Sequence, residues 1–199
     1  MDHASDSKPG VAGLHTGVVA LAHAGVVILL LGLFAAADSW YILSGLALAG
    51  LLSIVTGALA GIAISTLVHE WFHFIGARVV RGRYSRVRRI NLFAFDWDFK
   101  ANSRGQFLAM SYAGTLGSVI AIALLLATIP ADAPGRVTLL AATFGSLAFA
   151  GAIEWPVLGR VHAGGDPLAE LSRITPRVLL TSAVIGLLVL LTAASLLGA

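Results

Sequence analysis

The chain has 199 residues, of which 58% are hydrophobic and 12% are charged, and its mean hydropathy is +0.90. Soluble domains carry roughly 25% charged residues, so this composition excludes an ordinary soluble domain, and its apolar content excludes a disordered chain. The absence of cysteine excludes a disulfide framework. The meaning of the net charge of +3 depends on where the basic residues lie along the chain, and the value gives no reason to expect a nucleic-acid partner. We therefore predict an all-α integral membrane protein.

Five apolar segments are long enough to cross a bilayer, because a span needs about 20 apolar residues. They are residues 17–37, 41–77, 106–129, 137–158 and 178–197. The second segment would be roughly 55 Å long as one helix, nearly twice the hydrocarbon thickness. It is therefore either one long tilted helix or two pieces broken near Gly57 or Gly61. The sequence thus predicts five or six transmembrane helices in a single membrane domain, residues 1–199, in which the first span is peripheral.

Basic residues are distributed unevenly between the two ends of these spans. If the first span runs outward from the cytoplasm, one side holds Lys8, Arg78, Arg81, Arg83, Arg86, Arg88, Arg89, Lys100, Arg104, Arg160, Arg173 and Arg177. Only Arg136 falls on the other side. The positive-inside rule then predicts a multi-pass protein of the cell inner (cytoplasmic) membrane, with the N-terminus and the loop of residues 80–105 in the cytoplasm.

The loop of residues 81–104 is the only sizeable connection between the predicted spans. Within it, residues 90–99 are rich in aromatic side chains that alternate with other residues from Phe93 onward. Alternation of this kind indicates a strand, and we expect a small hairpin at the membrane surface. An aromatic belt with basic anchors at the lipid headgroups is a compatible interpretation.

A metal-binding motif lies inside the second apolar segment, where His69, Glu70 and His73 form the pattern H-E-x-x-H. Positions i and i+4 share one face of a helix, so both imidazoles can bind one Zn²⁺. The adjacent glutamate can then act as a general base toward a water at the metal. Ionisable groups inside an apolar helix are costly and indicate a functional site, although polar residues that pair with a neighbouring helix are the simpler alternative.

A catalytic zinc site normally has three protein ligands, so a third ligand must come from elsewhere in the chain. The candidates are Glu154, Asp166 and His162, with Asp96 and Asp98 in the loop as weaker options. Asp166 also fits a helix N-cap, because a proline follows it. Glu154 lies inside an apolar span and fits a metal ligand, an auxiliary acid or a substrate-binding group. Spacing alone leaves these alternatives open.

Three segments of the chain resemble the site-2 protease family of intramembrane zinc metalloproteases, in a short branch of membrane peptidases. Residues 68–78 (VHEWFHFIGAR) are similar to the family's zinc helix, and residues 106–118 (QFLAMSYAGTLGS) to the segment that opens its next core span. Residues 164–176 (GGDPLAELSRITP) resemble its aspartate segment. The chain departs from the pattern at Thr115, where proline is usual, and at Ile153 and Glu154, where an asparagine is expected. The resemblance covers residues 51–177.

The resemblance implies that His69, His73 and Asp166 bind one Zn²⁺ and that Glu70 is the catalytic base. Glu154 and His162 are further candidates, from their residue types and positions alone, for an auxiliary or substrate-binding role. The expected reaction is hydrolysis of a peptide bond within or close to the lipid bilayer. The expected partner is a membrane protein substrate, such as a single-span helix that unwinds locally before cleavage.

Three other functions compete with this interpretation. A catalytically silent relative would keep the metal site but serve as a scaffold or binding partner in the membrane. A membrane di-iron hydroxylase would need on the order of eight clustered histidines, whereas this chain has six in all. A transporter is disfavoured because the chain contains no repeated half. The sequence carries no signal for an oligomeric state.

Overall fold

The computed structural model describes residues 13–199, and the predicted cytoplasmic residue Lys8 lies outside that range. Five long helices form the bundle: α1 (Thr16–Ser44), α2 (Ala47–Val79), α3 (Arg104–Thr128), α4 (Pro134–His162) and α6 (Pro176–Leu197). Each is long and apolar enough to cross a membrane. The remaining elements are the short helix α5 (Pro167–Leu171) and the strands β1 (Tyr84–Ser85) and β2 (Asp96–Trp97). The fold is therefore all-α and has the features of a multi-pass membrane protein.

The second apolar segment forms one unbroken helix, which decides between five and six spans in favour of five within the described residues. The turn at Gly45 ends α1 with a positive φ of 64°, and α2 starts two residues later. The first span was expected to end before Asp38, but α1 continues to Ser44. Asp38 is tolerated inside the helix because its carboxylate accepts a hydrogen bond from Ser53 and pairs with Arg136 at 2.8 Å.

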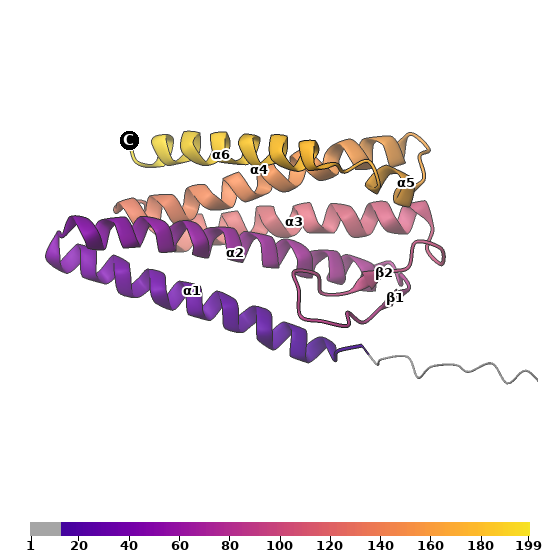
Figure 1. The fold of residues 1–199 in the computed structure, drawn as a ribbon, viewed down its shortest axis with the longest axis horizontal. Coiled ribbons are helices and arrows are strands. Elements are labelled where there is room, and N and C mark those ends of the chain that lie inside the picture. The colour runs from indigo at the N-terminus through magenta and orange to yellow at the C-terminus, as the bar shows by residue number, and fades with distance from the viewer. Residues whose placement is uncertain (1–12) are drawn as a thin grey trace, which may run out of the picture.

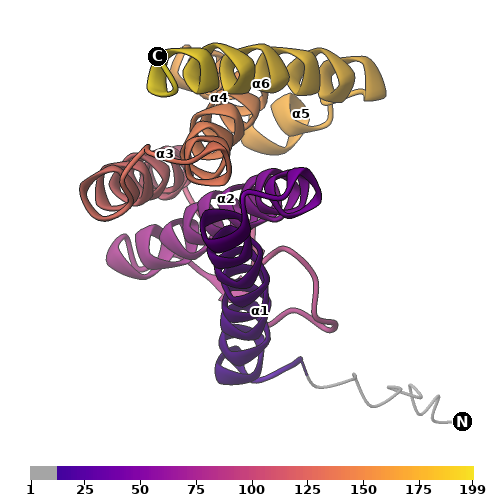
Figure 2. The ribbon, with the colours of Figure 1, turned by 90° about the vertical axis from the view of Figure 1, so that its left-hand side faces the viewer.

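Helices α2 and α4 are the centre of the bundle. α2 packs against α1, α3 and α4, and α4 also packs against α6 (Figures 1 and 2). Small residues allow the close approach of α2 and α4: a Cβ atom at Gly57 would lie within 2.5 Å of the Gly135 carbonyl oxygen. Glycine at such contacts is typical of helix packing in membranes. Leucine side chains such as Leu21 and Leu180 cover the outer faces of α1 and α6, where they are mostly exposed.

The strands and α5 lie at one end of the bundle, which we call the hairpin end; there α2 and α4 finish and α1, α3 and α6 begin (Figure 1). The strand prediction over residues 90–99 is correct only for Asp96 and Trp97, which pair antiparallel with Ser85 and Tyr84. The hairpin is therefore minimal. Most of the alternating aromatic side chains do not extend a sheet: Phe95, for instance, packs on Phe74 of α2.

All described lysine and arginine residues except Arg136 lie at the hairpin end or in the loop attached to it. Arg136 is at the opposite end, in the first turn of α4, where it is paired with Asp38 and Asp132. The uneven distribution of charge expected from the sequence is therefore a property of the folded bundle.

Candidate metal centre

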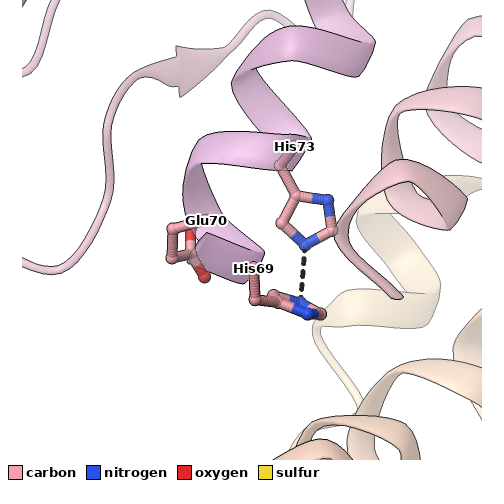
Figure 3. A group of neighbouring side chains, drawn as sticks. All are labelled: His69, Glu70 and His73. Carbon is pink, nitrogen blue, oxygen red and sulfur yellow. Dashed lines mark hydrogen bonds between the residues drawn. The ribbon is translucent and has the colours of Figure 1, made fainter. Parts of the chain in front are cut away.

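His69 and His73 lie one turn apart on α2 and direct their imidazoles to a common point (Figure 3). Their Nε2 atoms are 2.9 Å apart. Successive turns of an α-helix place positions i and i+4 on the same face, which is why the motif brings the two rings together. His69 is only 5% exposed and the His73 side chain 11%, so both rings are largely buried in the bundle.

The hydrogen bonds behind the two rings determine which nitrogens face the common point. His73 Nδ1 lies 3.0 Å from the Met110 carbonyl oxygen, which can only accept, so Nδ1 donates and carries the proton. A neutral imidazole then presents an unprotonated Nε2. His69 Nδ1 lies 3.0 Å from the Ser118 hydroxyl, which can accept its proton and give His69 the same tautomer. Helix α3 thus orients both rings with Nε2 facing inward.

Glu154 of α4 completes the group. Its Oε1 atom lies 2.8 Å from His69 Nε2 and 3.3 Å from His73 Nε2. The second oxygen, Oε2, is buried and has no hydrogen-bond partner among the described residues. A buried carboxylate oxygen without a partner is costly, and such an atom calls for a missing cation or water.

Two imidazole nitrogens and a carboxylate oxygen are a donor set that zinc uses in catalytic sites. Tetrahedral zinc holds its donors at about 2.0–2.2 Å, which places neighbouring donor atoms roughly 3.3 Å from one another. The three separations found here are 2.8, 2.9 and 3.3 Å. A single proton on one Nε2 atom would form a hydrogen bond to only part of this group of three atoms, whereas one metal ion can bind all three. The residues present therefore fit a metal.

Glu70 is half-buried, and one of its carboxylate oxygens lies within 4.8 Å of ligand atoms on both histidines. It makes no hydrogen bond or ion pair with another described residue. Figure 3 shows its carboxylate on a different side of α2 from the His73 ring. The Glu70 carboxylate is thus close to the histidine nitrogens, where it could bind a metal held by them or accept a proton from a water beside it.

The site depends on the close approach of α3 to α2. A Cβ atom at Gly114 would overlap the His73 ring, and one at Gly117 would overlap the Phe72 side chain. Glycine at these two positions lets α3 reach the histidines and place the Met110 carbonyl and the Ser118 hydroxyl behind them.

The structure does not bring Asp166 or His162 into this group. Asp166 is exposed and caps α5, since its Oδ1 accepts a hydrogen bond from Ala169 N at 2.9 Å. The N-cap interpretation is therefore confirmed. His162 is the last residue of α4 and is exposed. Asp98 accepts backbone hydrogen bonds from the turn that follows it, and Asp96 is exposed on β2.

A second buried histidine links three segments beside the site. His23 of α1 is 5% exposed; its Nδ1 accepts a hydrogen bond from the Trp71 indole at 3.1 Å. Since an indole nitrogen can only donate, His23 Nε2 carries the proton, which it donates to the Asn91 carbonyl oxygen at 2.7 Å. His23 is therefore a packed polar residue that joins α1 to α2 and to the loop.

Sequence reasoning missed the two groups that orient the histidines. Ser118 is a hydroxyl in an apolar segment with many small residues, and such a residue is a signal for a polar contact between helices. The Met110 contribution is a main-chain carbonyl, which no residue type reveals.

Comparison of the chain with family models, curated proteins and solved structures found no match. The resemblance to site-2 proteases therefore rests on the sequence motifs.

Proposed function

We propose that the chain is a zinc-dependent intramembrane endopeptidase of the site-2 protease type. The observation that carries the proposal is the convergence of His69 Nε2, His73 Nε2 and Glu154 Oε1 inside an apolar bundle, with Glu70 beside them. Two histidines, a carboxylate ligand and a free neighbouring carboxylate are the parts that metal-dependent peptide hydrolysis requires.

The proposed ligands are His69, His73 and Glu154. The family resemblance favours Asp166 as the third ligand, whereas the geometry supports Glu154, because Asp166 already caps α5. When bound, the zinc supplies Lewis acidity, which polarises a peptide carbonyl and makes water nucleophilic near neutral pH.

The chain's own residues have separate tasks in this reaction. Ser118 and the Met110 carbonyl keep the histidines in the ligand tautomer. Glu70 takes a proton from the attacking water and passes it to the leaving amine. Its carboxylate has no hydrogen-bond partner among the described residues, so it is free to accept that proton.

The substrate proposed for this site is a single-span helix or a peptide bond close to the membrane. Helical carbonyls are already hydrogen-bonded, so the substrate must unwind before cleavage. The short hairpin at the hairpin end offers strand edges to which an unwound segment can add. Because nearly all basic residues lie at this end, we infer that it faces the cytoplasm, in the cell inner membrane.

The test is the Glu70→Gln variant of the purified protein, reconstituted with single-span peptides of varied sequence. Glu70→Gln should keep its zinc and lose cleavage, since the ligands are intact and the base is absent. Asp132→Asn is the matched control: it removes an exposed carboxylate at the opposite end, and it should keep both zinc and cleavage. Cleavage that persists in Glu70→Gln removes Glu70 from the mechanism. Zinc in a wild-type protein that cleaves none of the peptides would favour a catalytically silent scaffold.

A further inference from the structure

A pocket of about 510 Å³ opens at the hairpin end, away from the proposed metal ligands. It lies where α3 begins, beside the turn that joins α4 to α5 (Figure 1). Its volume falls within the range of about 300–1,000 Å³ that is usual for small-ligand sites. The pocket is lined by Trp97, Phe99, Asn102, Arg104, Phe107, Gly164, Gly165, Asp166 and Pro167.

Two opposite charges line this pocket without pairing with each other. Arg104 forms no ion pair, and its guanidinium makes no hydrogen bond with any residue between 13 and 199. Asp166 uses Oδ1 for the cap of α5 and has no cationic partner in the same part of the chain. The other polar side chain, Asn102, is engaged with the Arg83 backbone and the Asp98 carbonyl. Within residues 13–199, the pocket therefore offers a cation and an anion that have no ion-pair partner.

The turn that carries Asp166 depends on two glycines. Gly164 has a φ of +116°, which side chains rarely allow, and its open side faces the Arg104 guanidinium. A Cβ atom at Gly165 would lie 3.0 Å from the Arg160 carbonyl oxygen and 3.1 Å from the Glu170 side chain. The conformation that places the carboxylate at the pocket, with Arg104 beside it, is thus built into the sequence of the turn.

The walls of the pocket are aromatic. Trp97 and Phe99 are partly buried and Phe107 is buried, so the three rings form a fixed apolar surface next to the two charges. Arg104 is the first residue of the transmembrane helix α3, and α4 ends two residues before Gly164. The pocket is therefore at the boundary between hydrocarbon and water, where lipid headgroups lie and aromatic residues are enriched.

We propose that this pocket binds the headgroup of a phospholipid that carries both a phosphate and a primary amine. Arg104 would pair with the phosphate and Asp166 with the ammonium, while the rings contact the adjoining apolar part of the lipid. A lipid with phosphate alone would leave the Asp166 charge unpaired. This inference is independent of the proposed metal chemistry.

The test measures the thermal unfolding of the full chain in detergent, stripped of lipid and then supplied with one lipid at a time. Phosphatidylethanolamine should raise the unfolding temperature by about 5 °C when it is well above its Kd, and phosphatidylglycerol by clearly less. Arg104→Gln should weaken phosphatidylethanolamine binding by about tenfold or more. Asp166→Asn should abolish the preference over phosphatidylglycerol, and because asparagine is also a good N-cap this variant should still fold.

Arg177→Gln is the matched control, because Arg177 is an exposed arginine at the same end of the bundle that does not line the pocket. It should respond to both lipids as the wild type does. Equal responses of the wild type to the two lipids, or an equal loss in Arg177→Gln and Arg104→Gln, would overturn the proposal. Free phosphoethanolamine distinguishes a lipid headgroup from a soluble ligand with the same groups. If it raises the unfolding temperature as much as the lipid does, the pocket binds a soluble ligand and the lipid proposal is overturned.

Discussion

Replacing Glu154 with glutamine tests the identity of the third metal ligand. The substitution preserves the size of the side chain but removes the charge of the atom that lies 2.8 and 3.3 Å from the two histidine nitrogens. Loss of a residue that only supports a ligand typically costs 10–100-fold in metal affinity, so loss of a ligand carboxylate should cost at least about 100-fold, or about 3 kcal/mol. The protein should then lose its zinc to a competing chelator that the wild type withstands.

The assay is the zinc content of the purified protein after dialysis against a series of chelators of known affinity. Asp166→Asn is the matched comparison, since it neutralises the carboxylate that the family resemblance favours while preserving the cap of α5. It should bind zinc as the wild type does. The opposite pattern, with zinc retained in Glu154→Gln and lost in Asp166→Asn, would refute the assignment of ligands from the geometry.

Three further substitutions test buried contacts of the bundle, each by thermal unfolding in detergent. Gly114→Ala places a methyl group against the His73 imidazole, so it should destabilise the protein by about 1–3 kcal/mol and weaken zinc binding. Gly25→Ala is the control: it has no neighbouring atom within 4 Å and should have neither effect. His23→Leu should cost about 2 kcal/mol through two lost hydrogen bonds, and His23→Gln should recover part of that loss; equal losses would show that the bonds contribute nothing. Arg136→Gln should cost about 3 kcal/mol because the buried Asp38 carboxylate loses its partner, and a change near zero would show that the Asp38–Arg136 ion pair contributes nothing to stability.

The helices could be predicted because each carries a local signal. The apolar segments exceed the bilayer thickness, and Pro134 and Pro176 each occupy the first helical position, where proline is favoured. The pairing of His69 with His73 was also local, since it follows from helical periodicity alone. The predicted end of the first span was wrong for a related reason. A charged residue after an apolar segment indicates the end of a span, and the partner that neutralises Asp38, Arg136, is 98 residues away in the sequence.

The third ligand could not be predicted in this way. Glu154 is 85 residues from His69, and the two meet only because α2 and α4 pack in one particular register. That register depends on small contacts such as Gly57 against Gly135, which sequence periodicity does not specify. The motif resemblance pointed to Asp166 instead. The capping role of Asp166 follows from the proline after it, so the sequence alone could indicate that role.

The balance of charge inside the bundle distinguishes the candidate metal centre from the other buried polar groups. Asp38 is neutralised by Arg136, and His23 is satisfied as a neutral ring between an indole and a carbonyl group. Glu70 and Glu154, by contrast, have no lysine or arginine partner among the described residues. Two carboxylates in an apolar environment are expensive unless positive charge accompanies them, and a single divalent cation supplies the charge that this pair lacks. Charge balance and donor geometry are separate arguments, and both support the proposed metal at this place.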